Sequence, residues 1–107
     1  MKRGDVYWVQ FPAPAGRRPA VLVSRDESYA VRARVTVIPV TRTIRGIATE
    51  VRLGPSEGLP KVSVANADEI VTIPTSILDG RIIALSHAKI DALDDAIRFA
   101  LALDRHA

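Results

Sequence analysis

The sequence contains no cysteine and no long apolar run, and both absences narrow the class of protein. Without cysteine the chain can form neither a disulfide framework nor a thiolate metal site, which favours a reducing compartment. No segment approaches the ~18 consecutive apolar residues of a membrane-spanning helix. The basic start Met1-Lys2-Arg3 runs directly into Gly4-Asp5, where a signal peptide would need an apolar stretch. We therefore expect a cytoplasmic protein that does not enter a membrane.

Motifs for metal binding, nucleotide binding and paired-histidine catalysis are missing as well. The sequence has no His-x-x-x-His or Asp-x-Asp motif, no Walker loop and no glycine-rich dinucleotide turn. The acidic pairs Asp68-Glu69 and Asp94-Asp95 lack supporting ligands. His87 and His106 lie near opposite ends of a predicted helix, about 28 Å apart at 1.5 Å per residue, and cannot share a site within one chain. We therefore expect no metal, no cofactor and no histidine acid–base pair.

Length and composition predict one globular domain spanning residues 1–107. A hydrophobic content of 48% and a charged content of 25% are typical of a folded domain. A length of 107 residues leaves no room for a second domain. The net charge is +3, but residues 1–52 carry ten Lys and Arg against four Asp and Glu, whereas residues 53–107 carry five against eight. A basic half presented on one face would attract a polyanion, although basic residues also serve solubility alone.

Short β-branched and aromatic runs between turn residues predict a mainly β protein. Prolines and glycines mark turns, notably in Pro12–Gly16 and Gly54–Pro60. Pro39 falls inside a predicted strand and indicates a sheet edge or a bulge, because proline cannot donate to the ladder. The predicted strands are Asp5–Phe11, Arg18–Ser24, Val35–Thr41, Thr49–Leu53, Ser63–Ala67, Glu69–Ile73 and Arg81–Leu85.

The clearest helical pattern comes at the end of the sequence. Ser86 is a good N-cap, and one apolar stripe at helical spacing should cover the sheet. Phe99 and Leu103 widen the apolar surface and either join the core or contact another protein chain. The fold class is therefore α+β, mainly β with a C-terminal helix. The members of the apolar stripe are Ile90, Leu93, Ile97 and Leu101.

Two predicted strands each carry a polar residue at the tip. Arg18 opens the apolar run Pro19-Ala20-Val21-Leu22-Val23, and Thr41 closes the run Val37-Ile38-Pro39-Val40. Arg18 and Thr41 lie at equal offsets from the segment that connects their strands, so antiparallel pairing brings them to the same edge. A guanidinium beside a hydroxyl suits a phosphate whose charge must be stabilised in a five-coordinate transition state.

Four segments, in this order and at these spacings, resemble the MazF/PemK (Kid-like) family of toxin endoribonucleases: Gly4–Val9, Arg17–Ser24, Val37–Thr41 and Asp68–Ile73. The resemblance extends from about Lys2 to about Leu103. It implies a compact SH3-like β-barrel of the MazF/CcdB type, usually in a homodimer. It also implies a toxin of a type II toxin–antitoxin system that cleaves single-stranded RNA without a metal and is held inactive by a cognate antitoxin. Messenger RNA is the expected substrate, with rRNA and tRNA as alternatives, and cleavage would inhibit translation and growth.

The expected reaction is one in which the substrate supplies the nucleophile. Attack by the ribose 2′-hydroxyl on its neighbouring phosphate yields 2′,3′-cyclic phosphate and 5′-hydroxyl ends. We assign Arg18 to neutralising the scissile phosphate and Thr41 to donating a hydrogen bond to a phosphoryl oxygen. The family also credits the matching arginine with acid–base work, although a pKa above ~12 makes a guanidinium a poor base. Three other readings stay open: a CcdB-like gyrase-binding toxin, a non-catalytic RNA-binding barrel, and plain surface roles for Arg18 and Thr41.

Other basic and aromatic residues are candidates for contacts to RNA. Tyr7 and Trp8 are the two aromatic candidates, and we expect one of them at most to stack on a base. Several arginines adjoin Arg18 or flank the loop after Thr41, where they would contact backbone phosphates. These candidates are Arg17, Arg42, Arg45 and Arg52.

Three positions depart from the family or stay ambiguous. Ser63, in Val62-Ser63-Val64, stands where the family reads Asp-Ser-Val and either contacts RNA or is structural. Glu69 stands where the family has glutamine, and this carboxylate could alter base preference, act as a weak general base or pair with a nearby arginine. The connection Pro12–Arg17 is shorter than the family's loop and lacks its acidic residue. Any mechanism that depends on that carboxylate therefore does not carry over.

Overall fold

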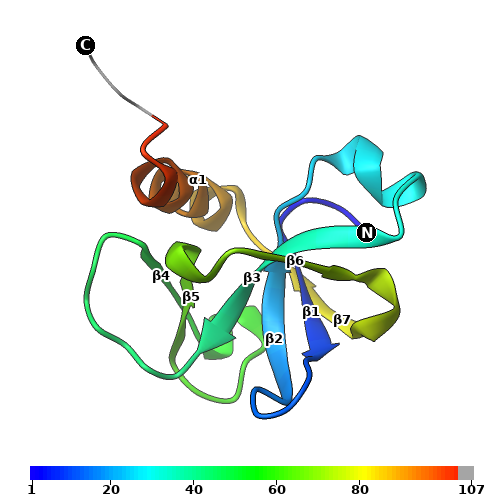
Figure 1. Cartoon of the computed structure of the whole chain (residues 1–107). Coiled ribbons are helices and arrows are strands. Elements are labelled where there is room, and N and C mark those ends of the chain that lie inside the picture. The colour runs from blue at the N-terminus through cyan, green and yellow to red at the C-terminus, as the bar shows by residue number, and fades with distance from the viewer. Residues whose placement is uncertain (104–107) are drawn as a thin grey trace.

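The computed structural model describes residues 1–103, which fold into an antiparallel sheet with one helix packed across one end of it (Figure 1). Four short 3-10 helices interrupt the connections: η1 (Asp26–Ala30), η2 (Pro55–Glu57), η3 (Ala67–Glu69) and η4 (Thr75–Ile77). The strands are β1 (Asp5–Gln10), β2 (Arg17–Leu22), β3 (Arg34–Thr41), β4 (Glu50–Leu53), β5 (Ser63–Asn66), β6 (Val71–Pro74) and β7 (Leu78–Ala84), and the helix is α1 (His87–Leu101).

The strands follow the order β4-β5-β3-β2-β1-β7, and β6 pairs with β3. The mainly β class and the C-terminal helix are confirmed, but the sheet does not close into a full barrel. In the described part of the chain, β6 forms backbone pairs only with β3, and β7 forms backbone pairs only with β1. One physical reason lies at Pro74, the last residue of β6, which cannot donate to a ladder and leads through η4 into β7. The sheet therefore remains open between β6 and β7.

Along one side of the central strand β3, the first half pairs with one strand and the last two residues pair with another. Arg34 to Val37 pair with β6, whereas Val40 and Thr41 pair with β5. Pro39 lies between these two ladders, in a central strand rather than at a sheet edge. A residue without an N–H group is tolerated where one ladder ends and the next begins.

Two apolar clusters form the core on either face of the sheet. Successive side chains of a strand point to opposite faces, so neighbouring residues join different clusters. Val21 and its partner Ile38 join one cluster, while Leu22 and its partner Val37 join the other. Helix α1 covers the first cluster with Leu93, which is 1% exposed. Complete burial of such a leucine is worth roughly 1.5–3 kcal/mol.

The ends of α1 agree with the sequence pattern at the start and differ at the finish. The Ser86 hydroxyl accepts the N–H of Lys89 at 3.2 Å, which confirms the predicted N-cap. Leu101 was predicted to be buried but is half-exposed, because the helix ends there and the next residue, Ala102, adopts a left-handed conformation. Phe99 and Leu103 are 66% and 61% exposed, so neither joins the core.

Several strand boundaries differ from their expected positions, and the largest shift is that β7 begins at Leu78 and not at Arg81. The strand predicted to begin at Glu69 begins at Val71, because Ala67–Glu69 forms η3 instead. The Asn66 side chain accepts the N–H of Asp68 at 3.0 Å and starts this turn. In residues 1–103 no helix is long and apolar enough to cross a membrane.

Candidate active site

The structure brings Arg18 and Thr41 together where β2 begins and its neighbour β3 ends, and this end of the two strands is called the edge from here on. Strand β2 pairs with β3 through Ala20↔Pro39 and Val21↔Ile38, and the same register continued by two residues sets Arg18 opposite Thr41. Both side chains are half-buried and line the same hollows in the surface. The predicted juxtaposition of guanidinium and hydroxyl is therefore present, and no direct hydrogen bond links the two side chains.

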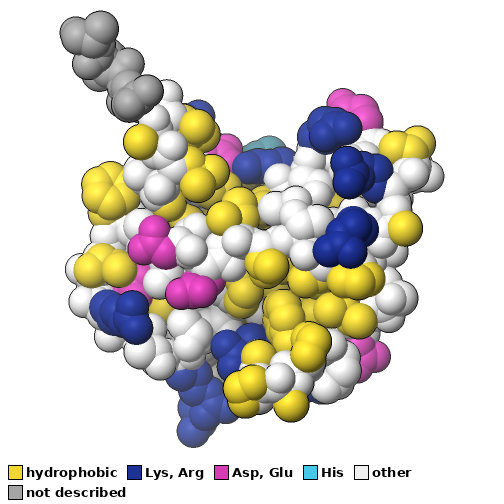
Figure 2. Space-filling view, viewed as in Figure 1, with side chains coloured by type: hydrophobic (Ala, Val, Ile, Leu, Met, Phe, Trp, Pro, Cys, Tyr) yellow, Lys and Arg dark blue, Asp and Glu magenta, His cyan; other side chains and the backbone are white. Residues whose placement is uncertain are grey.

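Two adjoining hollows open at this edge, and Arg18, Thr41, Thr43 and Ala15 line both of them. The first, here called the Phe11 groove, has a volume of ≈ 540 Å³, and Figure 2 shows apolar side chains gathered on this face of the molecule. The second, the Trp8 groove, has a volume of ≈ 340 Å³. The additional lining of the Phe11 groove is Phe11, Pro12, Pro39, Arg45, Asn66, Glu69, Val71 and Ile73, and that of the Trp8 groove is Trp8, Arg17, Pro19, Val40, Arg42, Leu59, Pro60, Lys61 and Ser63.

The hydrogen bonds of Arg18 and Thr41 leave both side chains available to a ligand. Arg18 Nη2 donates to the carbonyl oxygen of Ala15 at 3.1 Å, and no carboxylate of residues 1–103 pairs with this guanidinium. Thr41 Oγ1 accepts the backbone N–H of Thr43 at 3.2 Å, so the hydroxyl proton of Thr41 remains free to be donated. The edge therefore offers one uncompensated cation and one hydroxyl donor.

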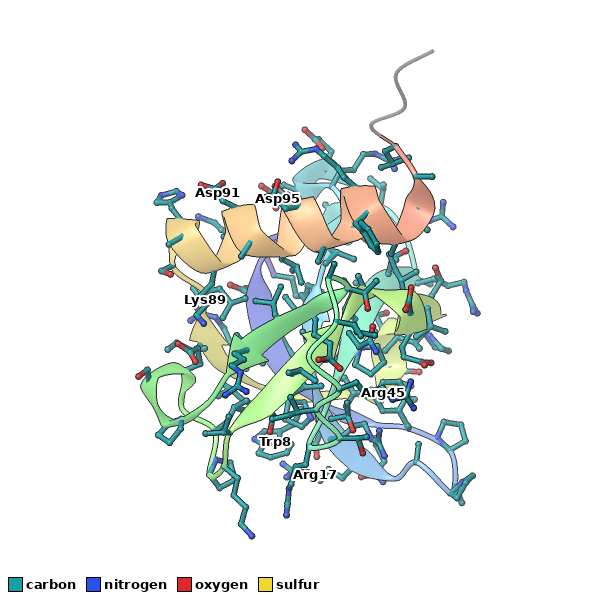
Figure 3. The ribbon with its side chains drawn as sticks, turned by 90° about the vertical axis from the view of Figure 1, so that its left-hand side faces the viewer. Trp8, Arg17, Arg45, Lys89, Asp91 and Asp95 are labelled. Atoms are coloured by element: carbon teal, nitrogen blue, oxygen red, sulfur yellow. The ribbon has the colours of Figure 1, made fainter. Side chains whose placement is uncertain are left out.

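The other predicted RNA-contacting arginines differ in their environments. Arg17 pairs with Asp79 at 3.2 Å and stacks over the Trp8 ring at 4.2 Å from its centroid, so one face of that ring is already covered. Figure 3 shows Trp8, Arg17 and Arg45 on the part of the molecule remote from α1. Arg42 lines the Trp8 groove and Arg45 lines the Phe11 groove. Arg52 is exposed on β4 and lines neither groove.

Ser63 and Glu69 occupy different grooves. Ser63 is 6% exposed and donates from Oγ to the Lys61 carbonyl at 3.1 Å, a bond that holds the start of β5. Glu69 is exposed in the Phe11 groove, and the expected ion pair with an arginine is not observed within residues 1–103. It is the one carboxylate among the described residues that line either groove. His87 is exposed at the start of α1 and lines neither groove, and His106 lies outside the described residues.

The loop between β3 and β4 is held by a carboxylate that the sequence analysis did not single out. The backbone N–H groups of Arg45, Gly46 and Ile47 donate to the Glu50 carboxylate at distances of 2.8–3.4 Å. Burial alone would raise the pKa of Glu50, but these donors and the charge of Arg45 outweigh it and hold the pKa below its ordinary value. Glu50 thereby fixes the loop that carries Arg45 to the Phe11 groove.

Asn66 is a second residue that the sequence analysis missed. It is 5% exposed and lines the Phe11 groove, and its Oδ1 accepts from Thr49 Oγ1 at 2.9 Å as well as from the Asp68 N–H. An asparagine whose side chain accepts the backbone N–H two residues on forms an Asx turn, and the preference of asparagine for such turns is the signal that could have indicated its structural role. Its proximity to Arg18 depends on the fold and has no local signature.

The arrangement suits a phosphodiester rather than a small neutral molecule. A cation and a hydroxyl donor stand where two grooves meet, so a phosphate there would carry one nucleoside toward each groove. No group of three or more His, Cys, Asp or Glu side chains within residues 1–103 is placed to hold a metal ion.

Residues 2–101 match the PemK-like, MazF-like toxins of type II toxin–antitoxin systems, and the chain belongs to this toxin family. Among its relatives is the probable endoribonuclease MazF5 of Mycobacterium tuberculosis, 36% identical over 104 residues that cover 96% of this chain and 94% of the relative. Endoribonuclease MazF3 of the same organism is 38% identical over 87 residues, which cover 81% of this chain and 84% of MazF3.

Solved structures agree with this assignment. Mycobacterium tuberculosis toxin MazF-mt6 superposes with a TM-score of 0.87 at 34% identity, covering 94% of this chain and 99% of the toxin. A mycobacterial endoribonuclease solved in complex with its cognate antitoxin superposes with a TM-score of 0.86 at 30% identity, covering 99% of both chains.

Proposed function

We propose that this chain is an endoribonuclease toxin that cuts single-stranded RNA at the edge where Arg18 faces Thr41. The observation that carries the proposal is the uncompensated Arg18 guanidinium beside a free threonine hydroxyl, at the junction of two grooves. Membership of the PemK-like, MazF-like toxin family and relatives named endoribonuclease support it. A CcdB-like gyrase-binding toxin would not need such a site.

The reaction is attack by the ribose 2′-oxygen on the adjacent phosphorus. The bond between the 2′-oxygen and phosphorus forms, and the bond from phosphorus to the 5′-oxygen breaks. The 2′-hydroxyl gives its proton to a base, and the leaving 5′-oxygen takes a proton from water. The products are a 2′,3′-cyclic phosphate and a 5′-hydroxyl. Proximity within the RNA supplies much of the rate, and the protein contributes orientation and charge stabilisation.

Each side chain at the edge has one role in this reaction. Arg18 stabilises the charge that develops on the phosphoryl oxygens, and it stays protonated throughout because guanidinium does not release its proton near neutral pH. Thr41 donates its hydroxyl proton in a hydrogen bond to one of those oxygens. Glu69, exposed in the Phe11 groove, is our candidate for accepting the proton of the 2′-hydroxyl. Arg42 and Arg45 contact phosphates of the flanking nucleotides, and Ser63 contributes to the wall of the Trp8 groove. Arg17 reaches a phosphate only by exchanging its exposed ion pair with Asp79 for that contact.

The working protein has two further partners. One is a second copy of the chain in a homodimer, and the other is a cognate antitoxin, as in the complex solved for the mycobacterial relative. Both would act in the cytoplasm, where messenger RNA is the substrate and its cleavage arrests translation.

Incubation of the purified protein with a mixed-sequence RNA, in excess EDTA, tests the function. We expect cleavage to persist in the chelator and to leave fragments that end in a cyclic phosphate and begin with a 5′-hydroxyl. Replacement of the ribose 2′-hydroxyls by hydrogen should abolish cleavage. Activity that disappears in EDTA and returns with Mg²⁺ or Mn²⁺ would overturn the mechanism, and RNA binding without cleavage would indicate a non-catalytic RNA-binding protein.

A further inference from the structure

A third hollow lies at the end of β3 opposite the catalytic edge. Its volume is ≈ 330 Å³, and four arginines line it: Arg3, Arg25, Arg32 and Arg34. We call it the arginine pocket. Arg34 and Thr41 stand at the two ends of β3, seven residues and so about 23 Å apart at ~3.3 Å per residue. Figure 2 shows basic side chains grouped at the upper right, where the same view in Figure 1 places the segment between β2 and β3, and an apolar patch below them. The pocket is therefore separate from the candidate active site.

Three of the four arginines carry charge that no carboxylate neutralises. Arg3 is committed to Asp94 at 2.7 Å. Arg34 donates to the carbonyl oxygen of Thr72 at 3.2 Å, which leaves its charge in place. Arg25 and Arg32 are exposed and have neither an ion pair nor a side-chain hydrogen bond in the described part of the chain.

The nearby acidic groups do not cancel this excess. Asp26, on η1, accepts the backbone N–H of Arg3 at 2.7 Å. Glu27 follows it on the same short helix and is exposed. Neither carboxylate forms an ion pair with an arginine of the pocket. The pocket keeps a positive field, because its three guanidinium groups without a carboxylate partner outnumber the two carboxylates of η1.

Hydroxyl groups add donors between the arginines. Ser24 Oγ accepts the N–H of Thr36 at 2.8 Å, so its own proton is free. The hydroxyls of Thr36 and Thr72 lie 2.8 Å apart and share one hydrogen bond, which leaves one of their two protons free as well. The pocket is thus rich in donors, and its floor is apolar, formed by Val23, Ile70 and Ile97.

This composition selects a phosphate attached to an organic group. Guanidinium and hydroxyl donors match the several acceptor oxygens of a phosphate, and the apolar floor accommodates a sugar or a base. The volume lies near the lower end of small-molecule sites, which suits one nucleotide. Strand β6 lies between this pocket and the active site: Val71 and Ile73 line the Phe11 groove from one face of the strand, while Thr72, and Ile70 just before the strand, line the arginine pocket from the other face.

We propose that the arginine pocket binds one nucleotide of the RNA at a distance from the cut, as a second anchor for the strand that crosses the edge of β6. This proposal rests on the proposed function, because RNA is named as the occupant on the strength of the cleavage site. RNAs long enough to reach both sites then bind more tightly than short RNAs, and Arg25, Arg32 and Arg34 account for the difference.

The test measures binding and not cleavage, so its failure is distinct from failure of the nuclease assignment. Fully 2′-O-methylated RNAs, which lack the nucleophile, are lengthened one nucleotide at a time and titrated by fluorescence anisotropy at several salt concentrations. We expect affinity to rise by a step at one length. Arg32→Ala or Arg25→Ala should remove that step and flatten the log–log salt dependence for long RNA by about one unit, with no effect on short RNA.

A matched control removes one cation elsewhere. Lys89 lies on α1 eight residues before Ile97, about 12 Å away along the helix axis, and its Nζ donates to the Arg52 carbonyl. Lys89→Ala should leave the length step intact. If Lys89→Ala weakens long RNA as much as Arg32→Ala does, the effect is general electrostatics and the proposal is wrong.

Free phosphate is the other source of the same chemistry. Titration of inorganic phosphate, followed through the backbone resonances of Thr36 and Thr72, should cause shifts that Arg32→Ala abolishes. If phosphate causes these shifts but affinity shows no step with RNA length, the pocket is a small-anion site and not a second anchor, which overturns the proposal. Absence of both effects overturns it as well.

Discussion

At the scale of single residues, the chemistry available at the candidate site depends on which polar side chains have no ion-pair or hydrogen-bond partner within the protein. Arg18 donates only to the Ala15 carbonyl, and Thr41 keeps its proton because its oxygen serves as an acceptor. By contrast, Arg17, the residue before Arg18, is committed to Asp79 and Trp8. Two neighbouring arginines of the same strand therefore have different chemistry available, and the sequence gives no sign of the difference.

Arg18→Ala or Thr41→Val should each lower single-turnover RNA cleavage by ~10²-fold or more, the scale of losing one transition-state donor. Neither side chain carries part of the core, so the melting temperature and circular dichroism spectrum should stay close to those of the parent. Arg18→Lys keeps the charge and loses the planar fork, and it should retain more activity than Arg18→Ala. Near-parental rates in both Arg18→Ala and Thr41→Val would show that the chemistry occurs elsewhere.

Tyr29 is a residue whose titration should be visible in stability. Burial, with a further contribution from the charge of Asp26, raises the pKa of Tyr29 to about 12, and its hydroxyl donates to the Ser24 carbonyl at 2.9 Å. Because the folded-state pKa lies above the ordinary value of 10, the stabilisation is complete below pH 10 and is lost as the pH rises toward 12.

Urea unfolding of the parent and of Tyr29→Phe across this range checks the prediction. At neutral pH the variant should be less stable by about 0.5–1.5 kcal/mol, the net value of one hydrogen bond. The gap between the two proteins should narrow above pH 10. A gap that is constant with pH would mean that the phenol titrates equally in the folded and unfolded states.

At the scale of elements, sequence pattern predicts those parts that local physics determines. The N-cap at Ser86, the buried stripe around Leu93 and the antiparallel pairing of β2 with β3 were predicted. The meeting of Arg18 and Thr41 was predicted because antiparallel pairing of adjacent strands converts equal sequence offsets into proximity. The shift of the sixth strand comes from tertiary context, because Asn66 turns the chain and η3 replaces the predicted start of that strand. The position of Arg52 on β4, outside the lining of both grooves, also depends on the fold, and its contact with RNA stays a prediction.

The loop between β3 and β4 should respond to the charge of Glu50. Glu50→Gln removes the charge that three backbone N–H groups share, so the amides of Arg45, Gly46 and Ile47 should exchange faster with solvent. RNA affinity should fall as well, because Arg45 is no longer held at the Phe11 groove. In the parent the low pKa of Glu50 means that this order is complete above pH 4.5 and is lost as the pH falls below that value.

The matched control is Glu57→Gln. Glu57 also accepts a backbone N–H, that of Gly54 at 2.7 Å, but it lines neither groove. This variant should loosen η2 and leave RNA affinity unchanged. Equal losses of affinity in both variants would indicate a general effect of removing negative charge.

At the scale of the whole molecule, two features imply a partner that covers the candidate active site. The grooves beside Arg18 and Thr41 are open to solvent, and the first half of the sequence, residues 1–52, is basic. An active nuclease would harm its own cell, and an antitoxin segment with carboxylates and apolar anchors would fit the Phe11 groove, where Arg18 and Arg45 stand beside Phe11 and Val71. RNA and antitoxin should then exclude each other in a binding titration. Charge reversal at Arg45, Arg45→Glu, should weaken both.

Competition is best followed with an uncleavable RNA and a peptide from the antitoxin. Lys89→Glu, a charge reversal of a residue that lines neither groove, is the control and should affect neither ligand. A ternary complex with undiminished RNA affinity would place the antitoxin on another surface. The exposed Phe99 and Leu103 on and after α1 would then be the first surface to test.

Strand β3 pairs first with β6 and then with β5, so the hairpin that contains β5 can separate from the sheet without complete unfolding. The β4–β5 hairpin joins the rest of the sheet through only two residue pairs, Val40↔Ala65 and Thr41↔Val64, and Thr41 belongs to this narrow connection, whereas Arg18 lies on β2 in the larger ladder. Sub-global opening of the hairpin, which requires less free energy than complete unfolding, would release Thr41 from its ladder and leave Arg18 in place. Catalysis would then stop in a state that still has most of its native structure. The proposed catalytic pair thus spans two ladders of the sheet, and its geometry would report whether the β4–β5 hairpin is closed.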